Sequence, residues 1–342
     1  MKIEQNISLR PFNTFRIDAK AKHFASFKTL DELAQLTKDF DRTEKLILGG
    51  GSNILFVKDF DGIVLNNQIL GIEELHEEPE HVFVKVGAGE NWHEFVQYCI
   101  KKDWSGLENL SLIPGNTGAA PMQNIGAYGV EQEDLFWDLE AFHLKEQRVR
   151  TFTRTDCQFG YRESVFKGKY KDQFAILSVT FRLRKKPIFH TSYGAIKEEL
   201  DKMGVKDLSI WAISQAVINI RSSKLPDPKE IGNAGSFFKN PIISEEQYRR
   251  LKKDYPNIVG FETVAGTVKL AAGWLIEQCG PKESVTWKGY RKGDAGCHAR
   301  QALVLVNYGN AKGKEILELS KEIQKSVKKK FEIELEREVN VI

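Results

Sequence analysis

Apolar residues in the first half of the chain recur in short runs that end at glycine or asparagine, a pattern typical of β-strands joined by tight loops. Three such runs predict strands at 44–48, 62–67 and 81–89. A helix is expected over 90–103, where apolar side chains recur at helical spacing. Its predicted buried face consists of Trp92, Phe95, Val96 and Cys99.

The segment 106–129, GLENLSLIPGNTGAAPMQNIGAYG, interrupts this pattern. It is rich in glycine and holds two prolines, so it cannot form a long regular element. A loop of this length inside a compact domain is usually functional or disordered. Its many apolar residues argue against disorder, and we therefore expect an ordered loop that brings backbone close to a ligand.

Strands are expected again at 136–144, 148–154 and 174–186. In the third run, apolar residues alternate with polar ones, which predicts a strand buried on one face only. The alternating positions are Leu177, Val179, Phe181 and Leu183.

Helical periodicity dominates after residue 193. A helix is expected at 209–224, and the stiff, polar stretch 224–229 that follows it is a candidate domain boundary. Further helices are predicted at 244–255, 268–279 and 314–330, a strand at 301–307 and a strand-like end at 331–342. The mixture predicts an α+β protein of two or three domains.

Composition excludes several classes of protein. The 342 residues include 50 Lys+Arg and 47 Asp+Glu, with a formal net charge of +3, which argues against a dedicated nucleic-acid binder. No apolar run reaches the ~20 residues that span a bilayer, and the first residues lack the core of a signal peptide. Four separated cysteines without a CxxC pair indicate buried free thiols and no metal site. We expect a soluble cytoplasmic protein.

Two glycine-rich loops are the first candidates for chemistry. GGGSN at 49–53 follows a predicted strand, where backbone amides can approach an anion, although alone it more often marks a tight turn. It fits neither the Walker A motif nor the dinucleotide fingerprint. Together with the loop 106–129, it suggests a long diphosphate-containing ligand held mainly by backbone.

Three polar motifs follow. In FGYRES, Arg162 could equally be a surface arginine. In GNAGSFFKNP, Ser236 lies between glycines and two phenylalanines that can bury the segment, so its hydroxyl could donate a proton. In LEREV, Glu336 and Glu338 share a strand face, and acidic residues at a sheet edge are usually solvated.

Taken together, these segments resemble one family, the type I bacterial UDP-N-acetylenolpyruvoylglucosamine reductases (MurB). The likeness rests on the order and spacing of motifs along nearly the whole chain. They are NTFRI, ILGGGSNILF, VGAGENWH, the loop 106–129, FGYRES, SYGAIKEEL, KLPDP, GNAGSFFKNP, KLAAGWLIEQ, QALVLVN and LEREV.

The resemblance implies an FAD-binding domain of the vanillyl-alcohol-oxidase (PCMH) type and a smaller C-terminal α+β substrate-binding domain. The FAD-binding part would comprise subdomains 1–72 and 73–222, and the substrate domain 223–333. The stretch 334–342 is a candidate to pack back on the first subdomain. Neither glycine loop holds a histidine or cysteine suited to attach the flavin, so non-covalent FAD is expected.

The resemblance also implies site residues. FAD would contact Gly49, Gly50, Gly51, Ser52, Asn53, Pro114, Gly115, Thr117, Gly118, Gln123, Asn124, Gly126, Ala127, Tyr128 and Tyr161. The substrate would contact Tyr193, Arg221, Lys224, Asn240 and Gln301. Arg162 and Glu338 would stabilise an enolate-like species, and Ser236 would donate the proton. Glu338 lies four residues from Ile342, where strands often fray, so this role requires a pinned segment.

The activity that the resemblance implies is NADPH-driven reduction of UDP-N-acetylenolpyruvoylglucosamine to UDP-N-acetylmuramate, a step in peptidoglycan precursor synthesis. The alternatives are a flavin-dependent oxidoreductase of the same fold with another substrate, or a non-catalytic nucleotide-sugar-binding relative. A basic RNA-binding module fits less well, because the lysines between 321 and 330 fit the wet face of one helix. We expect a monomer with neither nucleic-acid nor membrane partners.

Overall fold

The computed structural model describes residues 2–263, 266–282 and 284–342. By contacts, the chain forms two compact units. The first contains residues 1–7, 21–51 and 60–223, and the second contains residues 8–20, 52–59 and 224–342. The chain therefore passes for the last time from the first unit to the second at Ser223–Lys224, where KLPDPK begins.

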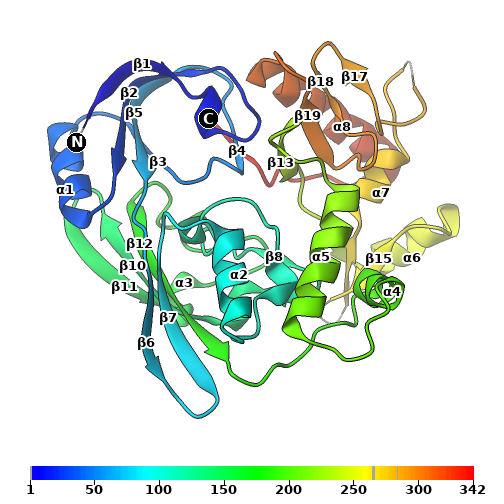
Figure 1. Ribbon diagram of the computed structural model, residues 1–342. Helices are drawn as coiled ribbons and strands as arrows, with labels where there is room; N and C mark the ends of the chain where they lie inside the picture. The colour runs from blue at the N-terminus through cyan, green and yellow to red at the C-terminus, as the bar shows by residue number, and fades with distance from the viewer. Residues whose placement is uncertain (1, 264–265, 283) are drawn as a thin grey trace. The chain divides into compact units, whose positions relative to one another are not determined.

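Two sheets form the frame of the first unit (Figure 1). One has the order β1-β2-β5-β3, in which β2 and β3 both run parallel to β5. Its strands are β1 (Glu4–Ser8), β2 (Lys20–Phe27), β5 (Phe60–Asn67) and β3 (Lys45–Leu48). Helix α1 (Leu30–Asp39) contributes Leu33 and Leu36 to the core beside this sheet.

The other sheet has the order β11-β10-β12-β7-β6 and is antiparallel. Its strands are β11 (Arg148–Thr153), β10 (Phe136–His143), β12 (Phe174–Arg184), β7 (His81–Gly87) and β6 (Ile72–Glu77). Every strand that the sequence predicted in this region is present, which confirms those predictions.

The central strand β12 is more buried than its alternating pattern predicted. Residues from Ala175 to Phe181 are all buried, including Ser178 and Thr180. Ala175 and Leu177 pack into the core beside α1, while Val179 and Phe181 belong to a larger second core. The expectation of one wet face was therefore wrong, because this strand lies between two cores.

Helices of the first unit cover the larger core. Helix α2 (Trp92–Lys101) buries the predicted face, and α5 (Ile210–Lys224) lies beside it, with Gln97 Nε2 donating to Ser214 Oγ at 3.0 Å (Figure 1). Short helices α3 (Arg154–Cys157) and α4 (Gly194–Lys202) complete the helices of this unit among the described residues. Two 3-10 turns, at Glu108–Leu110 and Thr117–Ala119, lie within the glycine-rich segment. A small hairpin of β8 (Gly126–Ala127) and β9 (Val130–Glu131) begins at its end and continues just beyond it.

The second unit contains a sheet of order β13-β19-β18-β17, backed by helix α8. These elements are β13 (Gly232–Ser236), β17 (Arg291–Lys292), β18 (Ala295–Cys297), β19 (Val304–Asn307) and α8 (Gly313–Phe331). The buried stripe of α8 includes the expected Ile316, Leu319, Ile323 and Val327. The helix prediction at 314–330 is thus confirmed.

A three-stranded sheet and two helices make up much of the remainder. They are β14 (Ile242–Ser244), α6 (Glu245–Asp254), β15 (Gly260–Glu262), β16 (Thr267–Leu270) and α7 (Ala272–Glu277). The helix predicted over 268–279 is shorter than expected, because its first residues pair as β16 with both neighbouring strands. Strands β4 (Ile54–Leu55) and β20 (Asn340–Val341) form a parallel pair.

Candidate functional site

The first glycine loop leaves β3 at Leu48 and meets the second loop at once. A Cβ atom on Gly50 would lie 2.7 Å from Asn116 Oδ1 and 3.1 Å from Gly115 Cα. A larger residue at this position therefore requires the Asn116 side chain to move and the Gly115 backbone to give way slightly. The structure thus brings Gly49 and Gly50 into contact with the second loop, as a ligand shared by both loops requires.

The second loop is held by backbone hydrogen bonds to the strand-to-helix turn before α2. The amide of Trp92 donates to the carbonyl oxygen of Gly115 at 3.0 Å. The amide of Thr117 donates to Glu90 at 2.8 Å, and that of Gly118 to Ala88 at 3.0 Å. The loop is therefore ordered, as the sequence predicted, and presents a rigid backbone edge.

Asn124, a predicted flavin residue, organises the rest of this loop from the inside. Its side chain is fully buried, and Nδ2 donates to carboxylate oxygens of Glu131 and Glu133 and to the carbonyl oxygen of Gly160. Its Oδ1 accepts from the amide of Glu133 at 3.2 Å. These bonds shape the loop 106–129.

Arg162 lies against the same loop. Its Nη2 donates to the carbonyl oxygen of Gly126, its Nη1 donates to that of Asn124 at 3.4 Å, and its guanidinium lies over the ring of Tyr161. Glu131 lies 3.7 Å from Nη1. Burial raises the pKa of Glu131, while the Arg162 charge works in the opposite direction. Arg162 is therefore a mostly buried, oriented cation, not a solvated surface arginine.

Sequence reasoning missed Glu131 as a partner of Arg162. The two residues are 31 positions apart, and the hairpin of β8 and β9 brings the carboxylate to the arginine. No local motif carries this information, because the contact depends on how the loop turns back.

Tyr128, at the end of the loop, connects two predicted substrate residues. Its ring makes an edge-on contact with Tyr193 at 5.6 Å between centroids. Its hydroxyl also interacts with the guanidinium of Arg221, whose pKa is lowered chiefly by burial. The three side chains form one cluster in the first unit. Tyr193 immediately precedes α4 and is exposed, whereas Arg221 lies on α5.

Ser236 is the last residue of β13 and lies opposite Val304 of β19. A bulge separates it from Asn233, and Gly235 has φ +68°, a backbone conformation that side chains rarely adopt. Phe237 and Phe238, at 0% and 1% exposed, anchor the chain just beyond it. The hydroxyl therefore sits on a rigid, re-aimed backbone, and the predicted burial of both phenylalanines is confirmed.

Glu338 is pinned beside this serine. Its amide donates to the carbonyl oxygen of Phe237 at 2.9 Å, and Arg337 pairs with Phe238 as an isolated bridge. Further along, Ile342 exchanges backbone hydrogen bonds with Leu55 and Val57 at 3.0 and 2.8 Å. The segment thus does not fray, so the condition for a role of Glu338 is met.

Side chains on both sides of Glu338 strengthen this attachment. Arg337 Nε donates to Ser320 Oγ at 3.0 Å and Nη2 donates to Gln324 Oε1 at 2.6 Å, which ties the segment to α8. The buried Lys239 forms an ion pair with Glu336 at 2.7 Å. Glu336 thus has a structural partner in Lys239.

Of the remaining predicted substrate residues in the second unit, two lie at the start of α7 and the third lies at the end of α5. Asn240 Oδ1 accepts from the amide of Ala272 at 2.9 Å, the first residue of α7. Gln301 lies over the same helical turn, since a Cβ on Gly273 would be 2.7 Å from its Oε1. Lys224 ends α5 and is exposed. Asn240 and Gln301 are therefore brought together by α7.

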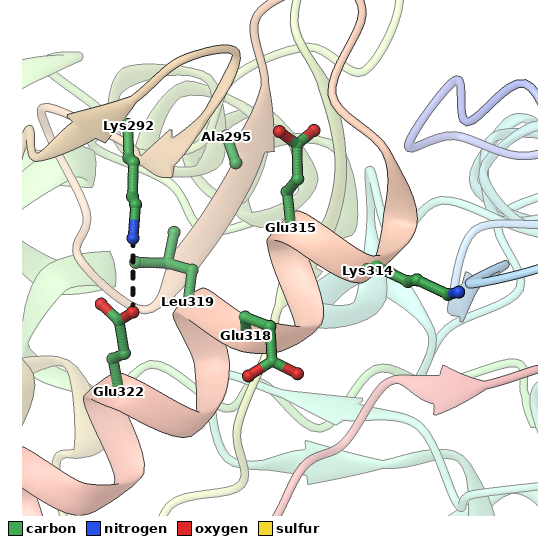
Figure 2. Close-up of a pocket in the computed structure, with 7 residues that line it drawn as sticks. All are labelled: Lys292, Ala295, Lys314, Glu315, Glu318, Leu319 and Glu322. Atoms are coloured by element: carbon green, nitrogen blue, oxygen red, sulfur yellow. Dashed lines mark ion pairs between the residues drawn. The ribbon is translucent and has the colours of Figure 1, made fainter.

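A surface hollow of about 280 Å³ lies between α8 and strands β17 and β18 (Figure 2). Lys292 and Glu322 form an ion pair across it at 3.5 Å. Glu315 accepts from the backbone amide of Lys312 and so caps the start of α8. None of the predicted site residues lines this hollow. Its Glu322 and Glu315 make the ion pair and the cap of α8 described above.

The four cysteines are free and buried, as predicted. Burial raises the pKa of the Cys157 and Cys297 thiols to about 12. In the part of the chain that the structure describes, no helix has both the length and the apolar character needed to cross a membrane.

FAD fits the cradle formed by the two glycine loops. The loops touch at Gly50, where a side chain would crowd Asn116 and Gly115, and the second loop is fixed by its backbone hydrogen bonds. A diphosphate held by main-chain groups needs this close and rigid approach. The predicted contacts Gly49, Gly50, Gly51, Pro114, Gly115, Thr117, Gly118, Gln123, Gly126, Ala127 and Tyr161 lie in or beside this cradle in the first unit, while Ser52 and Asn53 belong to the second.

Comparison with known proteins identifies the class first. The family profile "FAD binding domain" matches residues 21–144, and the profile "UDP-N-acetylenolpyruvoylglucosamine reductase, C-terminal domain" matches residues 227–342. The fold and site thus define a two-part flavoprotein oxidoreductase, and the predicted α+β class with an FAD-binding domain is confirmed.

Full-length relatives then identify the family. The UDP-N-acetylenolpyruvoylglucosamine reductases of Flavobacterium johnsoniae and Amoebophilus asiaticus are 50% and 51% identical to the chain, each over 100% of both proteins. That of Pseudomonas syringae pv. tomato is 46% identical over 100% of the chain and 99% of the relative. The chain belongs to the UDP-N-acetylenolpyruvoylglucosamine reductase family.

A solved structure supports the fold. The crystal structure of the reductase (MurB) from Thermus caldophilus superposes with a TM-score of 0.69 over 100% of the chain and 99% of that protein, at 24% identity.

Proposed function

We propose that the protein reduces UDP-N-acetylenolpyruvoylglucosamine to UDP-N-acetylmuramate at the expense of NADPH. The observation that carries this proposal is full-length identity of about half to reductases of that name, on a chain with the FAD-binding cradle described above. When bound, FAD supplies the hydride chemistry that links NADPH to the vinyl carbon of the substrate.

The protein's own residues manage charge and the proton. Hydride addition leaves negative charge beside the substrate carboxylate, and we assign Arg162 and Glu338 to stabilise it as an enolate-like species. The carbon next to the carboxylate then needs a proton, which we assign to the Ser236 hydroxyl. A weak acid of this kind releases its proton only to a strongly basic carbon. Geometry supports the pair, because Glu338 is hydrogen-bonded to the residue after Ser236.

Binding of the uridine diphosphate and sugar falls to Tyr193, Lys224, Asn240 and Gln301. Lys224 is exposed and flexible, which suits a point charge for phosphate. The pairing of Asn240 and Gln301 at α7 supports a shared polar contact. We further propose that the protein works as a cytoplasmic monomer with non-covalent FAD, which size-exclusion chromatography and acid release of the flavin can test.

The test is a visible absorption spectrum of the purified protein under anaerobic conditions. We expect a flavin spectrum that bleaches with NADPH alone and recovers when UDP-N-acetylenolpyruvoylglucosamine is added. Bleaching without recovery would indicate another electron acceptor, and thus another oxidoreductase of this fold. A protein without flavin after incubation with FAD would contradict the proposal.

A further inference from the structure

Leu112 has a backbone conformation that a leucine rarely adopts. Its φ is +58°, in the left-handed region, three residues before Gly115 of the flavin loop. A side chain in this region is strained, so neighbouring groups must hold it there. The conformation of Leu112 sets the direction in which the chain enters Ile113, Pro114 and Gly115.

Two side chains from different helices form hydrogen bonds with the backbone of Leu112. The Nδ1 atom of His93, on α2, accepts a hydrogen bond from the amide of Leu112 at 2.9 Å. The Nε atom of Arg221, on α5, donates to the carbonyl oxygen of Leu112 at 3.1 Å. The amide and the carbonyl of the strained residue are therefore both occupied.

Arg221 also reaches the other end of the loop. Its guanidinium interacts with the hydroxyl of Tyr128, a second non-glycine residue in the left-handed region, with φ +52°. Asn109 Nδ2 donates to the carbonyl oxygen of Tyr128 at 3.0 Å. One arginine thus ties together the start and the end of the segment that carries the predicted flavin contacts.

His93 can play this part only when Nδ1 carries no proton. In a protonated imidazole both nitrogens are donors, so Nδ1 could no longer accept the hydrogen bond from the Leu112 amide. Burial lowers the pKa of His93, Arg221 lowers it further, and Glu94 on the same helix raises it. The acceptor form therefore prevails at neutral pH, and acid removes it.

We propose that His93 and Arg221 are positioning residues for FAD, which hold the loop 106–129 in its binding conformation through Leu112. Arg221 then acts on the flavin loop from inside the protein and not as a direct substrate contact. The proposal rests on the proposed placement of FAD on this loop. Its consequence is that retention of FAD depends on an unprotonated His93.

The experiment measures the rate of FAD release from the holoenzyme by the rise in flavin fluorescence. The variants are His93→Ala, which removes the acceptor, and His93→Asn, whose Oδ1 occupies the place of Nδ1. His76→Ala, on the exposed strand β6, is the matched control. We expect roughly fivefold to tenfold faster release for His93→Ala, as for one lost hydrogen bond, and a change below about twofold for the other two variants.

The pH dependence separates positioning from simple packing. Release from the wild-type protein should accelerate as the pH falls below about 6.5 toward the lowered pKa of His93. His93→Asn should lack this acceleration, since an amide does not titrate there. An identical pH profile in His93→Asn and wild type would overturn the proposal.

A double-mutant cycle tests the link to Leu112. Leu112→Gly removes the strain that His93 offsets, so His93→Ala should cost less in that background than alone. Arg221→Met should likewise speed FAD release, whereas a direct substrate contact would raise only the KM for the substrate. Equal costs in both backgrounds would refute the role of His93 through Leu112. A wild-type protein that binds no FAD would instead refute the proposed function, so the two failures are distinguishable.

Discussion

Asn53 Nδ2 donates a hydrogen bond to the carbonyl oxygen of Glu338 at 3.1 Å, although the two residues are 285 positions apart. The carbonyl oxygen of Asn53 in turn accepts from the amide and the side chain of Asn340, at 3.1 and 3.0 Å. The end of the GGGSN motif therefore fixes the register of the LEREV segment. Glu338 is held through both its amide and its carbonyl oxygen, so the position of its backbone is fixed.

Replacing Ser236 tests the proton donor. We expect Ser236→Ala to leave flavin reduction by NADPH nearly intact and to slow reoxidation by the enolpyruvyl substrate by about 10²-fold or more, as for loss of a general acid. Stopped-flow absorbance measures both steps. Ser244→Ala is the control, because it removes the cap of α6 at a cost of about 1 kcal/mol in stability but should change neither step. Equal slowing of both steps in Ser236→Ala would show a structural role.

Replacing Arg337 should affect both the stability of the protein and the reoxidation of the flavin. We expect Arg337→Ala to destabilise the protein by about 1–3 kcal/mol, since the bonds to Ser320 and Gln324 are lost, and to slow reoxidation by substrate as Glu338 loosens. Thermal unfolding and stopped-flow kinetics measure the two effects. The exposed Arg249, paired with Glu245 on α6, provides the control, and Arg249→Ala should cost at most about 0.5 kcal/mol.

A methyl group at Gly50 should damage flavin binding. Its Cβ would lie 2.7 Å from Asn116 Oδ1 and 3.1 Å from Gly115 Cα, so the Asn116 side chain and the second loop must shift. We expect Gly50→Ala to weaken FAD binding by about tenfold or more, measured by fluorescence titration. Gly168→Ala is the matched control, because a Cβ there meets nothing within 4 Å and the backbone is not left-handed. Tight FAD binding by Gly50→Ala would contradict the assignment of this loop.

Lys224 should act on the substrate alone. We expect Lys224→Ala to raise the substrate Kd by about tenfold, as for loss of one charge-assisted bond, with unchanged FAD binding. Isothermal titration calorimetry with the UDP-sugar measures the first quantity and flavin fluorescence the second. Lys229→Ala, at a nearby exposed position, should change neither. Loss of flavin from Lys224→Ala would refute the assignment.

The four cysteine thiols should be unreactive in the native protein. With a pKa near 12 for Cys157 and Cys297, only about one thiol in 10⁴ is ionised at pH 8, and burial blocks access. We expect a disulfide reagent to label none of the four within minutes at pH 8. In denaturant all four should react. Rapid labelling of the native protein would show that a core containing cysteine opens.

The local pattern of apolar and polar residues was enough to predict most of the helices and strands. It was wrong where contacts with other strands or with a second core decided the structure. Strand β12 alternates in sequence, yet it lies in the middle of a sheet with a core on each face. Its buried Ser178 is accommodated because the hydroxyl donates a hydrogen bond to Glu140. Residues 268–270 have a helical pattern but pair as β16. In both cases tertiary contacts overrode the local preference.

The candidate site shows the same division. The contact between the two glycine loops was predictable, because a run of small residues lets backbone segments approach closely and the composition of the sequence shows such runs. The hydrogen bonds that His93 and Arg221 form with Leu112 were not predictable, because the three residues come from separate segments of the chain. The same holds for Arg337, whose partners on α8 could not be identified from the motif LEREV.

The parallel pair β4 and β20 has a consequence for synthesis of the protein. Residues 54–55 emerge from the ribosome early, but their strand partner at 340–341 emerges almost 300 residues later. At about 5–20 residues per second, that interval lasts on the order of 15–60 seconds. Segments 8–20 and 52–59 belong to the second unit, so most of their own unit, residues 224–342, is synthesised long after them. During that interval β4 lacks its strand partner, so the backbone groups that pair with β20 in the folded protein remain open.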